Sequence, residues 1–182
     1  MSDDQKVVLV DETDNQVGIE DKMEAHRNGG KLHRAFSIFV FNSKGQTLLQ
    51  QRAAKKYHAP KLWANTCCSH PFPGEDIMHA AHRRLGEEMG MDCNMHEAFS
   101  FIYKAPVGNG LTEWEFDHVV LGFSDQEPKP NADEVMAYKW VSLEELQEDI
   151  KANPDQYVPW LKISFDRLRD AYKKERDSRT AE

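Results

Sequence analysis

The alternation of apolar and polar residues predicts a chain built mainly of short strands. The most apolar stretch covers residues 32–42, where Phe36, Ile38 and Phe39 indicate a buried strand. The polar residues 42–45 end in Gly45 and form a hairpin turn signal, so residues 47–51 predict the returning strand. Further strands are expected at residues 7–10, 62–66, 99–104, 112–120 and 137–141.

Apolar residues spaced by four predict a central helix. Ile77, Ala81, Leu85 and Met89 place it within residues 75–89, and Gly90 supplies a stop. Three other helices are expected: a short charged one over residues 19–26, one over 143–150, and one starting near residue 159. Ser142 and Glu145 would form a capping box at the start of the helix expected over residues 143–150. The charged tail, about residues 173–182, is expected to fray.

Length and charge narrow the class of protein. The 182 residues suit one α+β domain spanning residues 1–182. A net charge of −8 argues against nucleic-acid binding, and phosphate would have to meet a local group of Lys and Arg. No apolar run is long enough to span a membrane, and the acidic N-terminus is unlike a signal peptide. Three cysteines suggest free thiols in the cytoplasm. No membrane contact or obligate protein partner is indicated.

Charged residues on the central helix form a motif. Glu75 precedes Arg83-Arg84-Leu85-Gly86-Glu87-Glu88 in an arrangement that resembles the Nudix box, a loop-helix-loop whose glutamates bind a divalent metal at a diphosphate. Ser69 and Arg84 depart from that pattern, and Arg84 replaces a metal ligand with a cation that could hold phosphate instead. An ordinary solvated helix face with mixed charges explains the same residues about as well.

A second set of residues has the composition of a metal site. His26 and His33 flank a Gly-Gly break, His70 follows Cys68 by two, and Glu113 and Glu115 share one face of a predicted strand. Three imidazoles and two carboxylates suit Mn²⁺ or Zn²⁺. Any one histidine is better explained by an ordinary core or surface role, so the hypothesis rests on the set. The remaining histidines, His58, His79, His82, His96 and His118, show no comparable context.

Together these residues resemble a known family. The run Asn65-Thr66-Cys67-Cys68-Ser69-His70-Pro71, the His26/His33 pair, Tyr103 and Glu113-Trp114-Glu115 are similar to type I isopentenyl-diphosphate isomerases, members of the Nudix fold that do not hydrolyse their substrate. The resemblance implies a mixed central sheet flanked by helices, with the Nudix-like core at about residues 31–165. It also implies interconversion of isopentenyl and dimethylallyl diphosphate in isoprenoid biosynthesis.

The resemblance also implies roles for individual residues. Catalysis would fall to Cys68 and Glu115, assisted by Tyr103, while Cys67 would face the core. The metal set above would hold Mn²⁺ or Zn²⁺, and Glu88 with the Cys68 carbonyl would hold Mg²⁺. The residues expected at the small-molecule diphosphate substrate are Lys22, Arg52, Lys56 and Arg84, with Trp160 as an aromatic wall.

The chemistry of such a reaction suits these side chains. Moving a double bond requires one proton to be added and another removed around a tertiary carbocation. We expect Glu115 to donate and Cys68, with a lowered pKa, to accept, although a reversible reaction leaves this direction open. Phe36, Trp63 and Trp160 are candidates for a dry lining. Trp160 could equally be a core tryptophan at a helix start.

Two other hypotheses compete with the isomerase. A Nudix hydrolase of a nucleoside diphosphate compound would need a full set of helix glutamates, and Arg84 argues against it. A non-catalytic protein whose His and Glu residues close a structural metal site is the second alternative.

Overall fold

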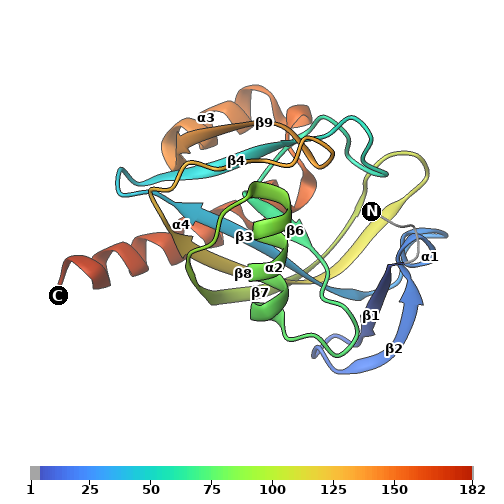
Figure 1. Ribbon diagram of the computed structural model, residues 1–182. Coiled ribbons are helices and arrows are strands. Elements are labelled where there is room, and N and C mark those ends of the chain that lie inside the picture. Colours follow the sequence, from blue (N-terminus) through green and yellow to red (C-terminus); the bar gives the residue numbers. More distant parts are fainter. Residues whose placement is uncertain (1–4, 182) are drawn as a thin grey trace.

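The computed structural model describes residues 5–181, in which nine strands form one mixed sheet flanked by four α-helices (Figure 1). The strands are β1 (Lys6–Val10), β2 (Gln16–Asp21), β3 (His33–Phe41), β4 (Gln46–Arg52), β5 (Trp63–Ala64), β6 (Cys67–Ser69), β7 (Asn94–Pro106), β8 (Thr112–Phe123) and β9 (Val135–Ser142). The helices are α1 (Lys22–His26), α2 (Ile77–Met89), α3 (Leu143–Ala152) and α4 (Pro159–Thr180), with a 3₁₀ turn at Pro154–Gln156.

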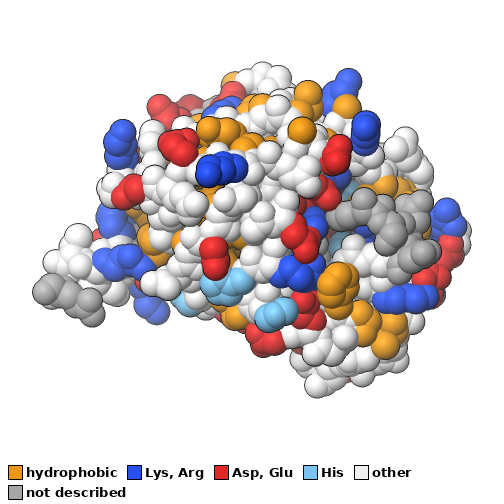
Figure 2. Space-filling view, viewed as in Figure 1, with side chains coloured by type: hydrophobic (Ala, Val, Ile, Leu, Met, Phe, Trp, Pro, Cys, Tyr) orange, Lys and Arg blue, Asp and Glu red, His pale blue; other side chains and the backbone are white. Residues whose placement is uncertain are grey.

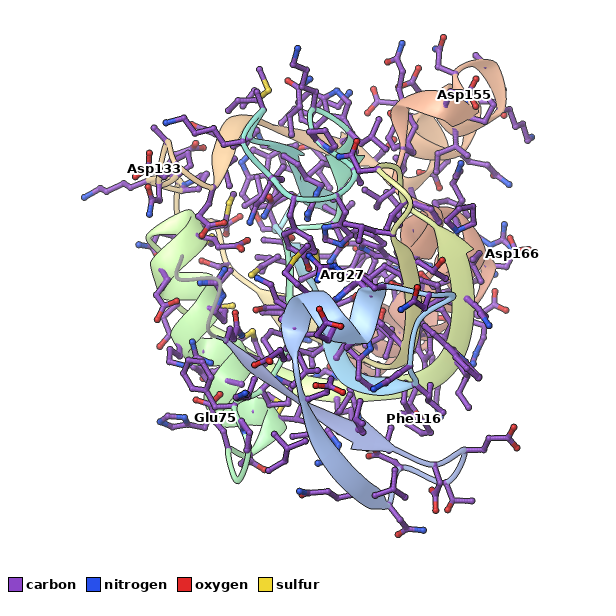
Figure 3. All side chains as sticks on the ribbon, turned by 90° about the vertical axis from the view of Figure 1, so that its right-hand side faces the viewer. Arg27, Glu75, Phe116, Asp133, Asp155 and Asp166 are labelled. Atoms are coloured by element: carbon purple, nitrogen blue, oxygen red, sulfur yellow. The ribbon has the colours of Figure 1, made fainter. Side chains whose placement is uncertain are left out.

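Strand β3 is the centre of the sheet. It pairs in parallel with β8 and antiparallel with β1, β4 and β6. Its side chains alternate between two buried faces: Ile38 and Val40 pack with α2, whereas Phe39 and Phe41 pack in the core that includes α3 and α4. Figure 3 shows α2 and α4 on opposite sides of the sheet. Helices therefore cover both faces, as the sequence predicted.

Helix α2 follows the predicted apolar spacing and has defined ends. The Asp76 side chain caps it by accepting from the backbone N–H groups of Met78 at 2.9 Å and His79 at 3.2 Å, so the helix begins two residues later than expected. Gly90 ends it with φ 61°, and a Cβ there would lie 2.4 Å from the Lys129 carbonyl oxygen. Only glycine fits this stop.

Three predicted elements need correction. Residues 19–21 belong to β2, because Ile19 pairs with Val8 in a hairpin, and α1 starts only at Lys22. The strand expected at residues 62–66 is the short β5, and the cysteines lie in β6. The tail does not fray within the described residues: α4 is helical to Thr180, anchored where Tyr172 stacks on Phe41 at 4.0 Å. Residues 1–4, on which the signal-peptide expectation rests, and Glu182 lie outside the described part.

The surface has no single dominant charge on the face shown in Figure 2, where acidic and basic side chains are interspersed among the residues drawn. Across residues 5–181, no helix is long and apolar enough to cross a membrane.

The capping box of α3 forms as predicted, with Ser142 Oγ accepting from Glu145 N at 3.1 Å and Glu145 Oε2 accepting from Ser142 N at 2.9 Å.

Candidate active site

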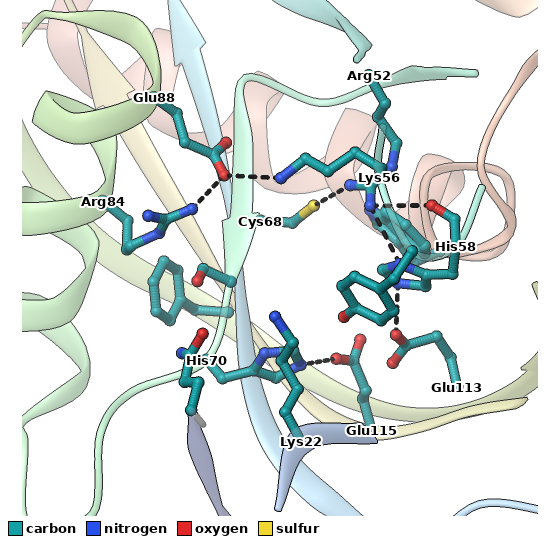
Figure 4. Close-up of a pocket in the computed structure, with 15 residues that line it drawn as sticks. Lys22, Arg52, Lys56, His58, Cys68, His70, Arg84, Glu88, Glu113 and Glu115 are labelled. Atoms are coloured by element: carbon teal, nitrogen blue, oxygen red, sulfur yellow. Dashed lines mark hydrogen bonds and ion pairs between the residues drawn. The ribbon is translucent and has the colours of Figure 1, made fainter. Parts of the chain in front are cut away.

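A small pocket opens where β3, β6, β8 and the loop between β4 and β5 converge (Figure 4). Its volume of about 30 Å³ holds a water or two. Every residue predicted for catalysis or substrate binding except Tyr103 lines it directly: Lys22, Arg52, Lys56, Cys68, Arg84, Glu115 and Trp160.

The predicted histidine and glutamate ligands come from four separate elements and meet in one place. Potential ligand atoms of His26, His33, His70 and Glu113 all lie within 4.8 Å of one another, and all four residues are buried. Glu115 completes the set, with Oε2 at 2.9 Å from His70 Nε2 and 3.4 Å from His33 Nε2. The five residues predicted from the sequence therefore form one cluster.

The protons and lone pairs in this cluster fit a cation. The Nδ1 atoms of His26 and His33 donate to the backbone carbonyls of Lys22 at 2.5 Å and Lys31 at 2.7 Å, which leaves each Nε2 with a bare lone pair. His26 Nε2 lies 2.6 Å from Glu113 Oε1. Glu113 Oε2 is buried and has no hydrogen-bond partner among the described residues. A divalent cation would satisfy all of these atoms.

Burial sets the charges of the cluster. It lowers the pKa of His26 and brings that of His70 down to about 3, so both imidazoles are neutral ligands at pH 7. Burial and the neighbouring Glu115 raise the pKa of Glu113 well above its ordinary value. Burial also acts to raise the pKa of Glu115, but the neighbouring imidazoles of His33 and His70 outweigh it and hold that pKa well below normal.

Cys67 and Cys68 face opposite sides of β6. Cys67 is fully buried against α2, as predicted, whereas Cys68 pairs with Ser37 and turns toward the pocket. Arg52 Nη1 approaches the Cys68 sulfur at 3.6 Å. Burial raises the pKa of Cys68 to about 12, because the effect of burial exceeds the opposite effect of the Arg52 cation. The expectation of a lowered Cys68 pKa is therefore wrong.

Glu115 stands across the pocket from Cys68 (Figure 4). Its Oε1 accepts from the Tyr103 hydroxyl, and its Oε2 lies beside His70. Burial, followed by the charge of Glu115, raises the pKa of Tyr103 well above its ordinary value, so the phenol stays a proton donor. Tyr103 therefore orients the carboxylate from behind the pocket wall.

Cations gather at the side of the pocket next to α2. Arg84 Nη2 pairs with Glu88 Oε1 at 2.5 Å, and Lys56 Nζ lies 3.6 Å from the same oxygen. These two cations outweigh the effect of burial and lower the Glu88 pKa. Glu134, which the sequence did not single out, also pairs with Lys56. Lys22 lies apart from this group, with its Nζ 4.4 Å over the Tyr57 ring.

Aromatic side chains supply the apolar wall. Trp160 is 3% exposed, lines the pocket and donates from Nε1 to Asn65 Oδ1 at 2.9 Å. Phe36 also lines it. Trp63 does not line it; this residue lies in β5, and Lys139 Nζ lies 4.3 Å from the centroid of its ring. The expectation for Trp63 is therefore wrong.

His58, which the sequence offered no reason to choose, belongs to the site. It is 5% exposed, and its Nε2 lies 2.6 Å from Glu113 Oε1. The only hint in the sequence is its place in the cationic loop beside Lys56, since nothing local relates it to a strand as distant as β8.

The chain is similar to known proteins over most of its length. A family model described as the NUDIX domain matches residues 31–161. An isopentenyl-diphosphate Delta-isomerase of Aromatoleum aromaticum is 53% identical, over 90% of this chain and 86% of its own. The isopentenyl-diphosphate Delta-isomerase of Photorhabdus laumondii is 54% identical, over 87% of this chain and 89% of its own. That of Pectobacterium atrosepticum is 47% identical, over 91% of this chain and 92% of its own.

The chain belongs to the isopentenyl-diphosphate Delta-isomerase family, within the NUDIX fold. Solved structures show the same fold. A Deinococcus radiodurans protein aligns with a TM-score of 0.75 at 23% identity, over 90% of this chain and 98% of its own. A MutT protein from Methanosarcina mazei aligns with a TM-score of 0.63 at 18% identity, over 80% and 95%. In this family member, the NUDIX fold and the buried acid–histidine cluster indicate divalent metal binding.

Proposed function

We propose that the protein interconverts isopentenyl diphosphate and dimethylallyl diphosphate by protonation and deprotonation through a tertiary carbocation. Its membership of the isomerase family supports this, and one observation carries it: the Cys68 thiol and the Glu115 carboxylate line the same small pocket. Two proton-transfer groups facing one cavity suit a reaction that adds a proton at one carbon and removes one from another.

Cys68 and Glu115 would exchange roles when the reaction reverses. The sequence-based assignment makes Glu115 the donor and Cys68 the acceptor. In the chain as folded, the pKa of Cys68 is raised and that of Glu115 is lowered, which favours a resting state with a protonated thiol and an ionised carboxylate. Tyr103 would hold Glu115 in place, and the indole face of Trp160 would stabilise positive charge by about 2 kcal/mol in a dry site.

Two metal sites accompany this proposal. His26, His33, His70, Glu113 and Glu115 would hold Mn²⁺ or Zn²⁺, and Glu88 with the Cys68 carbonyl would hold Mg²⁺ near the diphosphate. A bound divalent ion supplies electrostatic stabilisation and alters the acidity of its carboxylate ligands.

The cations of Arg52, Lys56 and Arg84, with Lys22, would bind the diphosphate. Lys56 and Arg84 now pair with Glu88 and Glu134, so the diphosphate would have to compete with these carboxylates. Arg84 also argues against hydrolysis, because it stands where the helix motif of a hydrolase has a glutamate that binds metal. A cytoplasmic location and the absence of a protein partner remain predictions from the sequence.

Proton NMR of isopentenyl diphosphate in deuterated water with Mg²⁺ tests the proposal. Deuterium should enter the new methyl group as dimethylallyl diphosphate appears, because the added proton comes from an enzyme group that exchanges with solvent. Unchanged substrate after long incubation would contradict the isomerase. Release of phosphate or nucleotide from a nucleoside diphosphate sugar, without any allylic product, would favour the hydrolase.

A further inference from the structure

His58 joins two parts of the site that are otherwise separate. Arg52 Nη2 donates to His58 Nδ1 at 3.2 Å and to the His58 carbonyl at 3.2 Å. On the other edge of the ring, His58 Nε2 lies 2.6 Å from Glu113 Oε1. One buried imidazole thus connects a cation proposed to bind the diphosphate with a carboxylate of the metal cluster (Figure 4).

The tautomer of His58 follows from its partners. A guanidinium can only donate, so Nδ1 must accept and Nε2 carries the proton of the neutral ring. The proton of His58 is therefore on the nitrogen that lies 2.6 Å from Glu113 Oε1. His26 contacts the same oxygen at the same distance of 2.6 Å, but with a bare Nε2, because its Nδ1 proton goes to the Lys22 carbonyl. At the same Glu113 oxygen, His58 therefore presents a hydrogen-bond donor and His26 presents an acceptor.

The consequence for Glu113 is a fixed orientation. Its Oε1 lies 2.6 Å from the protonated Nε2 of His58, while Oε2 is left without a hydrogen-bond partner among the described residues and lies 3.7 Å from His33 Nε2, inside the ligand cluster. Aromatic packing holds the His58 ring as well: Tyr57 stacks on it at 4.0 Å with an interplanar angle of 20°, and Trp160 lies on it at 6.0 Å and 29°.

We propose that His58 is a positioning residue for the metal centre, whose Nε2–H holds Glu113 so that its free oxygen points at the ion. Hydrogen bonds from outside a metal site onto a ligating carboxylate commonly change metal affinity 10- to 100-fold. This inference rests on the metal site of the proposed function, but it does not require the isomerase reaction to occur.

Titration of the metal-stripped protein with Co²⁺, followed by its visible absorption and by competition with a chelator, tests this role without measuring activity. His58→Phe keeps the ring stacking but removes the hydrogen bond from Arg52 to Nδ1 and the Nε2–H beside Glu113, so Co²⁺ affinity should fall about 10- to 100-fold. His58→Gln can still present an N–H at the Nε2 position, so its affinity should stay within about threefold of wild type. His58→Asn reaches only the Nδ1 position and should resemble the Phe variant. His79→Gln, on exposed α2 surface, is the matched control.

Wild-type affinity in His58→Phe would overturn the proposal. Should that variant not fold, equal affinities for the Asn and Gln variants would overturn it in the same way. A wild-type protein that takes up no Co²⁺ would remove the metal site and this inference with it. If the wild type binds Co²⁺ and the variants rank as expected, yet isopentenyl diphosphate is not turned over, the isomerase proposal fails and the role of His58 stands.

Discussion

At the scale of single residues, the adjacent cysteines show how strand geometry assigns different environments to identical side chains. Successive residues of β6 point to opposite faces, so Cys67 enters the core under α2 and Cys68 enters the pocket. Cys68 shares that pocket with Glu115, whereas Cys67 has no access to it. The chemistry proposed for a thiol in this protein can therefore be assigned to one sulfur.

Cys68→Ala should abolish most turnover while leaving diphosphate binding nearly intact. The substitution removes one proton-transfer group but none of the cations Arg52, Lys56 and Arg84, so kcat should fall at least 10²–10⁴-fold with KM within about threefold. Steady-state kinetics with isopentenyl diphosphate measures both. Cys93→Ala, a thiol outside the pocket, should keep the wild-type rate. A Cys68→Ala enzyme with most of its rate would refute the catalytic role.

At the scale of elements, an ion pair ties the loop before α2 to the helix. Arg83 donates to Glu75 from Nε at 2.8 Å and from Nη2 at 2.6 Å, and its guanidinium lies 4.0 Å over the Phe72 ring. Glu75 also accepts from Phe72 N at 3.0 Å. The loop from β6 therefore approaches α2 in a defined position, and His70 lies at its start.

Glu75→Gln should reduce stability in a pH-dependent way. The hydrogen bonds from Arg83 lower the Glu75 pKa from 4.5 to about 2, so the ionised form stabilises the fold above about pH 4.5 and this contribution is lost as pH falls toward 2. The free energy of unfolding should drop by about 1–2 kcal/mol at pH 7, allowing for solvent screening, and by almost nothing near pH 2.

Urea denaturation across this pH range measures the Glu75 effect. Glu144→Gln, an exposed acid of α3, is the control and should change stability by less than about 0.5 kcal/mol at each pH. A Glu75→Gln difference that stays constant from pH 7 to pH 2 would contradict the linkage.

At the scale of the whole molecule, the sequence predicted what local patterns determine and missed what only tertiary contact creates. The α2 spacing and the Gly90 stop are local signals, and both were right. Ile19 was misassigned because its hairpin partner Val8 decides its conformation. His58 was missed for the same kind of reason: its role depends on Glu113 and Arg52, which the fold brings together from separate strands. The His and Glu set could be grouped from its residue types and from the shared strand face of Glu113 and Glu115, and the family resemblance implied the same five residues.

The proposed metal site also has a consequence for the stability of the whole chain. Its ligands come from α1, β3, the segment after β6, and β8. One ion would therefore join elements that are far apart in the sequence, from α1 near the N-terminus to β8. Binding to the folded state alone, at 100 times the dissociation constant, adds about 2.7 kcal/mol. In a chain of this size that should raise Tm by roughly 5–10 °C.

Thermal unfolding of metal-stripped protein, followed by circular dichroism with and without Mn²⁺, measures this shift. Mn²⁺ binds unfolded Cys and His weakly, so the comparison reports the folded site. His33→Gln removes a ligand from the centre of the cluster and should lose most of the shift. Glu144→Gln, an exposed acid of α3 outside both proposed metal sites, should retain it. Equal Tm values for wild type with and without Mn²⁺ would mean that the inward-facing lone pairs of His26 and His33 are satisfied in some other way, and the proposed site would have to be abandoned.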